Sequence, residues 1–248
     1  MIEYSYKTIH SLRYAKNRKF FNKFIIEGKR IVESALAYDV KIGQIFCRHK
    51  FIEENDYWVQ KYLKKGTIVK TIDKKTFLKI STTKSPQGIL AVCDIPKQNP
   101  IKLTIDRWVY LDRISDPGNI GTLIRSCAWF GIKNIALSYK CADPYNPKSI
   151  RAAMGAHFVM NIHTNTDLII FKNTHRIIAA DLKGESASAY EFPKKCVLVL
   201  GSEAHGISNQ NLNCIEDFVL INKIGSGDSL NVSTAGSILI FLLMNKLK

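Results

Sequence analysis

Three short segments of the sequence combine side chains capable of acid-base or electrostatic chemistry with the glycine and proline residues of turns. They are Ser115–Gly131, Gly201–Gly206 and Gly225–Thr234. A carboxylate can act as a general base, a guanidinium binds anions, and amide or hydroxyl groups orient a ligand. The polar candidates in these segments are Asn119, Arg125, Glu203, His205, Ser229 and Asn231.

Each candidate also has an ordinary structural interpretation. Asn119 is a reasonable N-cap for the helix that follows it, and Ser229 alone would cap the C-terminal helix. Arg125 lies off the apolar stripe of its helix, so it either reaches the strand-end loops or is solvated. Glu203 is a general base, a ligand anchor or an acceptor for backbone N–H groups. Nothing nearby fixes His205, so an exposed residue is expected there rather than a catalytic one.

Each of the three segments follows a predicted strand, at 107–114, 197–200 and 217–224. Several strands in this half of the chain are apolar on both faces and alternate with helices, which favours a mostly parallel sheet covered by helices on both sides. Ligands of such sheets bind in the loops after the carboxyl ends of the strands. The sequence contains neither a P-loop nor a dinucleotide fingerprint after the first strand, so a common nucleotide site is not predicted.

The hydrophobic pattern predicts two α/β domains, with residues 1–97 as the smaller, residues 98–106 as a linker and residues 107–248 as the larger. In the smaller domain, strands are expected at 23–28, 42–47, 67–72 and 87–95, with helices at 29–39, 53–65 and 73–81. In the larger domain, helices are expected at 119–131 and around 148–158, and a last helix at the C-terminus.

The positive charge is concentrated in the first 100 residues. The whole chain has a formal net charge of +15, from 36 Lys and Arg against 21 Asp and Glu. Residues 1–100 contain 20 Lys and Arg against 9 Asp and Glu, and residues 101–248 contain 16 against 12. This difference favours a polyanion bound by the first domain, although charge alone does not distinguish RNA, DNA, a membrane surface or a merely soluble surface.

Other features narrow the class of protein. The longest apolar run, Ile238–Met244, is far shorter than the roughly 20 residues that span a bilayer. The N-terminus has no apolar segment typical of a signal peptide. The six cysteines form no C-x-x-C pair, which predicts reduced buried thiols in a cytoplasmic protein and no metal site.

The sequences "NIGTLIRSCAWFG", "LGSEAHGIS" and "INKIGSGDSLNVSTAG" resemble the three signature motifs of the SpoU/TrmH family of RNA 2′-O-ribose methyltransferases, in the SPOUT superfamily. The resemblance extends from about Trp108 to the C-terminus. It implies an α/β fold whose C-terminal segment forms a deep trefoil knot, an exception to the rule against knots. The first domain resembles the small α/β RNA-binding domain of rRNA-modifying members, through "IIEGKRIVESAL" and "GILAVCD".

The resemblance also implies a cofactor, S-adenosyl-L-methionine, and a homodimer held by the helix after the third motif. Cofactor-binding positions match Leu200, Gly201, Glu203, Gly206, Leu220, Ile221, Ser229 and Leu230. Catalytic positions match Asn119, Arg125, Glu203, Ser229 and Asn231. Asn222, Lys223 and Gly236 depart from the residues usual in the family.

The reaction implied is methyl transfer from a sulfonium to a ribose 2′-hydroxyl. Arg125 is expected to position the nucleotide and to stabilise the 2′-oxyanion, because free arginine is almost never deprotonated. Glu203 is chemically the easier base, but the family match favours a role in organising its loop. The first domain favours 23S-type rRNA as the substrate. A tRNA methyltransferase and a non-catalytic RNA-binding or ribosome-assembly protein are the alternatives.

Overall fold

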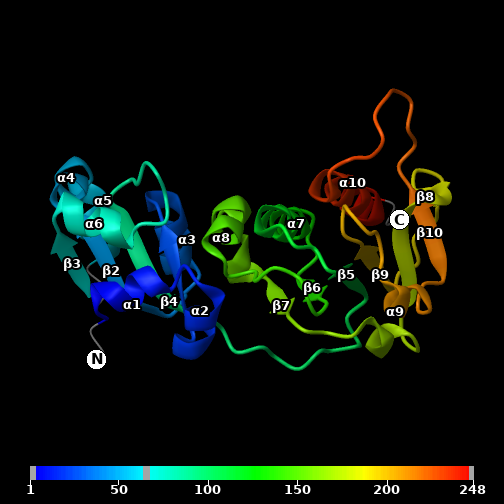
Figure 1. The fold of residues 1–248 in the computed structure, drawn as a ribbon, viewed down its shortest axis with the longest axis horizontal. Helices are drawn as coiled ribbons and strands as arrows, with labels where there is room; N and C mark the ends of the chain where they lie inside the picture. The colour runs from blue at the N-terminus through cyan, green and yellow to red at the C-terminus, as the bar shows by residue number, and fades with distance from the viewer. Residues whose placement is uncertain (1–3, 64–67, 246–248) are drawn as a thin grey trace. The chain divides into compact units, whose positions relative to one another are not determined.

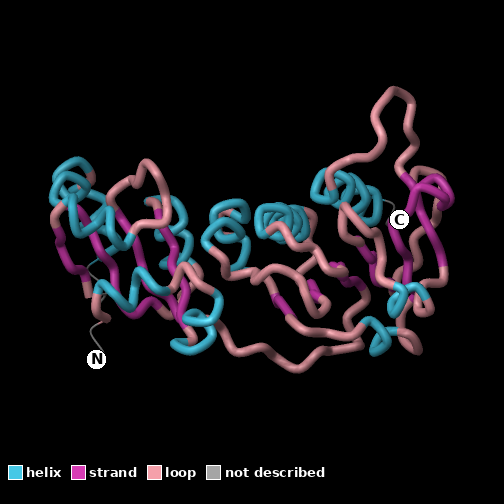
Figure 2. Tube along the Cα trace, in the orientation of Figure 1, coloured by secondary structure: helices cyan, strands magenta, loops and turns pink. Residues whose placement is uncertain are grey.

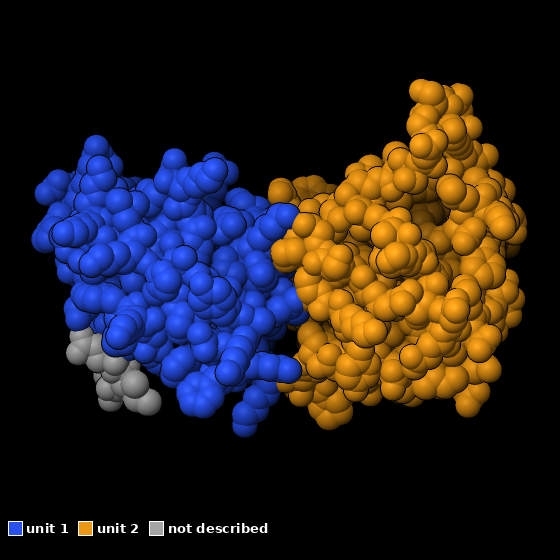
Figure 3. Space-filling view, viewed as in Figure 1, with its two compact units in different colours: residues 1–97, 143–158 blue, residues 98–142, 159–248 orange. Residues whose placement is uncertain are grey.

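In the computed structural model, which describes residues 4–63 and 68–245, the strands form two separate sheets (Figures 1 and 2). The sheets belong to two compact units (Figure 3). The first unit consists of residues 1–97 together with 143–158, and the second consists of residues 98–142 and 159–248. Residues 143–158 therefore group with the first unit, although they lie inside the range expected for the larger domain.

The first unit contains a four-stranded sheet of order β1-β4-β2-β3. Its strands are β1 (Lys23–Glu27), β2 (Ile42–Arg48), β3 (Val69–Ile72) and β4 (Ile89–Asp94). Strand β4 is antiparallel to β1 and β2, and β2 is parallel to β3. Strands β1, β2 and β3 therefore all end at the same edge of the sheet.

The helices of the first unit mostly follow the expected pattern. They are α1 (Tyr6–Ser11), α2 (Ala15–Phe21), α3 (Lys29–Ala37), α4 (His49–Glu54), α5 (Asp56–Leu63) and α6 (Lys74–Ile80). The single helix expected over 53–65 is wrong, because the helix is interrupted at Asn55 between α4 and α5, and residues 64 and 65 lie outside the described residues. The Asn55 side chain donates to the carbonyl of Phe51 and accepts from Lys29 Nζ, so it competes with the helical pattern of the backbone.

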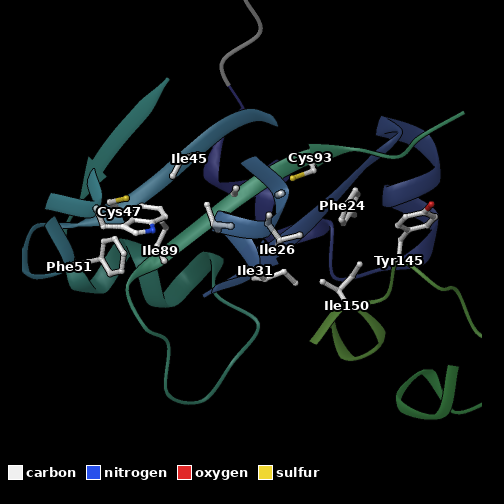
Figure 4. Close-up of a cluster of buried hydrophobic side chains, with 14 residues drawn as sticks. Phe24, Ile26, Ile31, Ile45, Cys47, Phe51, Ile89, Cys93, Tyr145 and Ile150 are labelled. Carbon is white, nitrogen blue, oxygen red and sulfur yellow. The ribbon is translucent and has the colours of Figure 1, made fainter. Parts of the chain in front are cut away.

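Residues 143–158 complete the core on one face of this sheet. Helix α8 (Pro147–Ala153) supplies Ile150 to that core, and the ring of Tyr145 packs 5.1 Å from the ring of Phe24, centroid to centroid (Figure 4). The Asp143 carboxylate binds the guanidinium of Arg18, whose side chain is only 1% exposed. Arg18 lies in the basic N-terminal segment of the sequence, but its guanidinium is paired with Asp143 inside the unit.

The second unit contains a six-stranded sheet of order β10-β8-β9-β5-β6-β7, in which every neighbouring pair is parallel. The strands are β5 (Arg107–Leu111), β6 (Asn134–Leu137), β7 (Asn161–His163), β8 (Arg176–Ser186), β9 (Cys196–Leu200) and β10 (Asp217–Leu220). The central strands β5, β6 and β9 are buried almost throughout. The predicted parallel α/β architecture of this domain is confirmed.

The helices of the second unit include α7 (Pro117–Trp129), α9 (Asn209–Leu212) and α10 (Val232–Asn245), with a single-turn 3₁₀ helix at Leu168–Phe171. Another 3₁₀ helix, Ala156–Val159, contains the last residues of the segment 143–158 that groups with the first unit. Helices α7 and α10 pack together, and a hydrogen bond of 2.7 Å joins Ser126 Oγ to Ser237 Oγ. Gly236 permits this packing, because a Cβ there would lie 2.4 Å from Leu123 Cδ2 and 2.6 Å from Leu200 Cδ1.

Strand β10 ends at Leu220, four residues earlier than expected, and the chain then leaves the sheet. Residues 221–231 form a loop that projects from the unit before α10 begins (Figures 1 and 2). Ile224 in this loop is 99% exposed and Leu230 is 50% exposed. Of the two apolar residues that suggested a longer strand, Ile224 therefore lies on the surface of a loop, and Ile221 is half-buried at its start.

The six cysteines are free thiols, and Cys141 is the only one of them that is not fully buried. Burial raises the pKa of Cys47 to about 12 and that of Cys196 to about 11, so neither is a reactive thiolate near neutral pH. Within the described ranges, no helix is long and apolar enough to cross a membrane.

Candidate active site at the carboxyl edge of the six-stranded sheet

Three of the candidate polar residues meet at the carboxyl edge of the six-stranded sheet. Asn119 Nδ2 donates to Glu203 Oε1 over 3.0 Å, and Asn231 Nδ2 donates to the same oxygen over 2.5 Å. Asn231 Nδ2 also lies 3.1 Å from Asn119 Oδ1. These residues follow β5, β9 and β10, so the parallel sheet brings Asn119 to two residues that lie more than 80 positions further along the chain. Asn119, Glu203 and Asn231 are called the amide–carboxylate network below.

Helix α10 is capped by Asn231. Its Oδ1 accepts hydrogen bonds from the backbone N–H of Ser233 (2.9 Å) and Thr234 (3.3 Å) and from Ser233 Oγ (2.6 Å). The expectation that Ser229 caps this helix is wrong, because the helix begins at Val232 and Ser229 lies in the exposed loop before it. Asn231 therefore accepts hydrogen bonds from free backbone N–H groups at the start of the helix and also binds Glu203.

Helix α7 is capped by Asp116 rather than by Asn119. The Asp116 side chain accepts a hydrogen bond of 3.0 Å from the backbone N–H of Asn119, and Pro117 occupies the first helical position. The expected cap at Asn119 is therefore wrong by three residues. Because Asp116 does the capping, the Asn119 side chain is available to bind Glu203.

Glu203 organises the loop in which it lies and the start of α10. Its Oε1 accepts hydrogen bonds from Asn119 Nδ2 (3.0 Å), Asn231 Nδ2 (2.5 Å) and the backbone N–H of Val232 (3.1 Å). Three donors on one oxygen leave that atom little capacity to take a proton from a substrate. The contacts therefore favour the organising role over that of a general base.

The loop after β9 is a tight hairpin. Ser202 and Gly206 exchange two backbone hydrogen bonds of 2.8 and 2.9 Å, and the N–H of His205 donates to Ser202 Oγ. A Cβ at Gly201 would lie 2.4 Å from the carbonyl carbon of Gly206. Gly201 is thus required by the return of its own chain, and Gly206 by its positive φ of 59°.

Arg125 lies apart from the amide–carboxylate network. It is exposed on α7, six residues after Asn119, and at 100° per residue it points about 240° around the helix from Asn119. Among the described residues, no hydrogen bond or ion pair joins Arg125 to another group. Its guanidinium is therefore available to a ligand.

A cavity of about 380 Å³ lies against the network, within the usual size of small-molecule sites. Asn119, Glu203 and Val232 line it together with Arg113 and Lys140. The two cations were not among the sequence candidates. In the sequence they are marked only by their positions, two residues after β5 and three residues after β6. Many ordinary surface residues lie at such positions, so this signal is weak.

The remaining predicted cofactor residues lie at two strand ends and in the projecting loop. Leu200 and Leu220 end β9 and β10, and their carbonyls accept from the backbone N–H of Asp112 and Ala187, respectively. Ile221 is half-buried, whereas Leu230 and Ser229 are exposed in the loop. None of these five residues lines the cavity of the network.

A polar network at the carboxyl edge of a parallel α/β sheet lies where such folds bind their ligands. The family model described as "SpoU rRNA Methylase family" matches residues 106–241, and the chain belongs to that family. A second model, "MRM3-like substrate binding domain", matches residues 5–91.

Curated relatives and solved structures agree with this assignment. The 23S rRNA (guanosine(2553)-2′-O)-methyltransferase RlmP of Bacillus subtilis is 29% identical over 252 residues, which cover 96% of this chain and 94% of the relative. The AdoMet-bound rRNA methyltransferase from Sinorhizobium meliloti superimposes with a TM-score of 0.82 at 26% identity, covering 98% and 95% of the two chains. A TrmH-family structure from Porphyromonas gingivalis gives a TM-score of 0.85 at 27% identity, with 99% of each chain covered.

These findings confirm the enzyme class predicted from the sequence. The chain is an S-adenosylmethionine-dependent RNA 2′-O-ribose methyltransferase with an α/β fold of the SpoU type. The trefoil knot and the roles of individual residues stay predictions.

The projecting loop suits S-adenosylmethionine in its chemistry. Among the described residues, no backbone N–H from Asn222 to Leu230 donates a hydrogen bond, so these groups are free for a ligand. The half-exposed side chain of Leu230 offers an apolar surface beside them. An adenosine needs both an apolar contact for its ring and hydrogen-bond partners for its edge, and the loop provides both.

Proposed function

We propose that this enzyme methylates a ribose 2′-hydroxyl of large-subunit rRNA. In this proposal the amide–carboxylate network and Arg125 form the catalytic centre, and the first unit holds the RNA. The observation that carries the proposal is the junction of Asn119, Glu203 and Asn231 beside a cavity at the carboxyl edge of the parallel sheet. The choice of rRNA is supported by the 23S rRNA substrate in the name of the Bacillus subtilis relative.

S-adenosylmethionine, when bound, supplies an electrophilic methyl group. This cofactor would be held by Leu230, Ile221 and the backbone of the projecting loop. The loop ends at Asn231, a residue of the network, so the cofactor would lie next to the network. The Glu203 carboxylate, in the loop after β9, accepts hydrogen bonds from Asn231 and from the backbone N–H of Val232 at the start of α10. These bonds keep the loop and the start of the helix in a fixed relation. The network therefore pre-organises the two loops on which the reactants must meet.

Arg125 is the residue assigned to the 2′-hydroxyl. Its guanidinium is exposed and unpaired among the described residues, and it carries five N–H donors and no acceptor. A guanidinium does not take a proton near neutral pH, so its role is to favour the developing 2′-oxyanion and to position the nucleotide. Removal of one such donor typically costs about 100- to 1,000-fold in rate.

The first unit offers a basic surface at one edge of its sheet. Strands β1, β2 and β3 end at this edge, and helices α3, α4 and α6 begin there. The cations placed at this edge by the topology, called the basic edge below, are Lys29, Arg30, Arg48, Lys50, Lys74, Lys75 and Lys84. Arg30, Lys74, Lys75 and Lys84 are exposed.

The carboxylates at the basic edge are occupied within the unit. Glu27 accepts hydrogen bonds from Ser81 Oγ, the backbone N–H of Thr82 and Thr83 Oγ1, and so holds the loop before β4. Asp73 caps α6 through Thr76, and these hydrogen bonds keep the pKa of Asp73 below its usual value. An excess of exposed cations therefore faces solvent, which suits the phosphate backbone of RNA.

A second copy of this chain is proposed as the partner of helices α7 and α10. Trp129 at the end of α7 is 81% exposed and Phe241 on α10 is 46% exposed, and the ring of Phe130 packs edge-on against Phe241 at 5.6 Å. Large exposed aromatic residues on two adjacent helices are typical of an interface. Leu239, by contrast, is 1% exposed and belongs to the core of its own unit.

Light scattering tests this proposal. Phe241→Glu should give a folded monomer at micromolar concentration, because Phe241 is 46% exposed and the charge enters the proposed interface. Leu239→Asp should instead lower the thermal stability of the chain itself by burying an unpaired charge. A monomeric wild-type chain would contradict the dimer.

The rRNA substrate is tested with labelled S-adenosylmethionine and transcripts of 23S rRNA, 16S rRNA and tRNA. Methyl transfer to a single ribose of the 23S transcript is expected, and mapping of alkali-resistant positions identifies it. Transfer to the tRNA alone would overturn the choice of substrate but keep the reaction. Absence of both methyl transfer and S-adenosylmethionine binding would overturn the reaction.

A further inference from the structure

A second cavity, of about 410 Å³, opens beside the cavity of the amide–carboxylate network. The two cavities share Arg113, Lys140 and His205 in their walls. None of the network residues lines the second cavity. It is therefore a separate space at the same edge of the sheet, connected to the candidate catalytic centre through two cations.

The backbone at both cations is in the left-handed region. Arg113 has a φ of 54° and Lys140 a φ of 69°. This conformation is unfavourable for a long side chain, and glycine or asparagine would adopt it more easily. The other described non-glycine residues with positive φ are Asn22, Asp39, Met154 and Asn165. Two long cations therefore occupy unfavourable backbone positions directly after the neighbouring strands β5 and β6.

The two strand ends are tied to each other. Ser138 Oγ accepts a hydrogen bond of 2.9 Å from the backbone N–H of Arg113 and donates one of 3.0 Å to the carbonyl of Tyr139. The Asp112 carboxylate, 1% exposed, accepts a short bond from the N–H of Ser208. These contacts hold the backbone beneath Arg113 and Lys140 in place, so both side chains start from fixed points beside the cavity.

Arg113 is not fully paired within the protein. Its Nε lies 3.8 Å from Asp112 Oδ1, which is beyond hydrogen-bond distance. This Nε is buried and, among the described residues, has no hydrogen-bond partner. A buried donor without a partner is unusual and costly. The Arg113 side chain as a whole is 35% exposed, so the rest of its guanidinium is accessible to an anion at the shared wall.

The rest of the second cavity suits a nucleobase. Tyr139 is 58% exposed and presents an aromatic ring, and Ile207 adds an apolar contact. The amides of Asn209 and Gln210 and the carboxylate of Asp167 also line the cavity. Proteins that read single-stranded RNA stack a base on an aromatic ring and bond its edge with groups of this kind.

We propose that this second cavity binds the nucleotide next to the one that is methylated, with its phosphate on Arg113 and Lys140 and its base against Tyr139. The inference rests on the proposed function, because it takes RNA as the substrate. The volume of about 410 Å³ is sufficient for one nucleotide. Asp167, which would repel a phosphate, suits an amino group on the base edge.

The test uses the full chain and an in vitro transcript of bacterial 23S rRNA. The variants are Tyr139→Ala, Tyr139→Phe and the double variant Arg113→Ala with Lys140→Ala. The matched control is Lys133→Ala with Lys172→Ala, which removes two exposed lysines of the same unit that line neither cavity. Three quantities are measured for each: kcat/KM for the transcript, its equilibrium affinity for the fluorescently labelled transcript, and its affinity for S-adenosylmethionine.

The double variant should lose at least about 10-fold in kcat/KM and in RNA affinity, with S-adenosylmethionine affinity within about twofold of the wild type. Tyr139→Ala should lose about 5- to 100-fold, the range of base stacking, and Tyr139→Phe should restore it. RNA affinity and kcat/KM equal to those of the control would overturn the cavity proposal while the methyl transfer of the wild type stands.

Loss of S-adenosylmethionine affinity in step with RNA affinity would also overturn it, because the cavity would then be part of the cofactor site. If the wild type transfers no methyl group, the proposed function fails and the binding measurement alone decides the cavity. Equal RNA affinity of all variants would then overturn it, and a selective loss in the Tyr139→Ala and double variants would support it.

Discussion

The basic edge of the four-stranded sheet consists mostly of cations, whereas the amide–carboxylate network at the carboxyl edge of the six-stranded sheet consists of amides and a carboxylate bonded to one another. The side chains of Lys74 and Lys75 at the first edge form no hydrogen bond with a described residue. Glu203 at the second edge accepts three hydrogen bonds. Free charges suit a long polyanion whose position can vary. A fixed network suits a reaction, which requires its groups within tenths of an ångström.

The two edges also differ in what a substitution should do. A lysine on the basic edge can be removed without leaving a buried partner, so RNA affinity should change and stability should not. A residue of the amide–carboxylate network cannot be removed without releasing a helix cap or a loop. The predictions below use this difference, beginning with the largest effect.

Arg125→Ala should reduce methyl transfer by about 100- to 1,000-fold. Affinity for S-adenosylmethionine should stay within about twofold, because Arg125 is exposed and forms no hydrogen bond or ion pair with a described residue of the projecting loop. Single-turnover rates and calorimetric titration of S-adenosylmethionine measure the two quantities. Parallel loss of both would make Arg125 a residue of the cofactor pocket.

Asn231→Ala and Ser229→Ala form a matched pair in the same loop. Asn231→Ala should lower the free energy of unfolding by about 1 to 2 kcal/mol, since it removes the cap of α10. It should also weaken S-adenosylmethionine binding and activity, because Glu203 loses a donor. Ser229→Ala should leave the stability unchanged, since Ser229 is exposed and caps nothing. Equal destabilisation by both, measured by denaturant titration, would contradict the assignment of the cap.

Gly236→Ala and Gly225→Ala form a pair, because Gly236 is tightly packed and Gly225 faces open space in the second unit. A Cβ at Gly236 would lie 2.4 Å from Leu123 Cδ2, so the variant should cost about 1 to 3 kcal/mol by overpacking. A Cβ at Gly225 meets nothing within 4 Å, and that variant should be neutral. Thermal melts of both variants measure this, and a neutral Gly236→Ala would show that α7 and α10 can move apart.

His157 should give the first unit a modest dependence of stability on pH. Burial lowers the pKa of His157 from 6.5 to about 4, and its Nε2 lies 2.7 Å from the carbonyl of Pro144. The unfolded chain binds the proton more readily, so this contribution is full above pH 6.5 and is lost as the pH falls toward 4. The slope due to His157 is at most about 1.4 kcal/mol per pH unit. Denaturation of wild type and His157→Gln from pH 7 to 4 should show a smaller slope in the variant.

Much of this structure could be predicted from the sequence, because local pattern decided it. The apolar strands "VLVL" and "IIAA" predicted a parallel sheet, and the order of the strands along the chain was correct in both sheets. The three polar segments were also found, since each follows a strand. Their resemblance to known motifs supplied the reaction, which no spacing of residues could have indicated.

The parts that could not be predicted depend on contacts between distant residues. Asn119 and Ser229 were taken as caps because their types suit a cap, but Asp116 and Asn231 occupy those positions. No local pattern distinguishes two capping residues a few positions apart. The grouping of residues 143–158 with the first unit depends on Asp143 and Arg18, which are 125 residues apart. The positive φ of Arg113 and Lys140 has no sequence signal either.

The difference between the two edges is tested most directly by the salt dependence of RNA affinity. A variant with Arg30→Ala, Lys74→Ala, Lys75→Ala and Lys84→Ala is compared with the wild type and with Lys41→Ala, which removes a lysine from the opposite edge of the same sheet. The measurement is log affinity for one 23S rRNA transcript against log salt concentration. The quadruple variant should show a slope shallower by about one for each lost phosphate contact, with S-adenosylmethionine affinity unchanged. A slope equal to that of the wild type and Lys41→Ala would contradict the account, because the RNA would then be held without the basic edge.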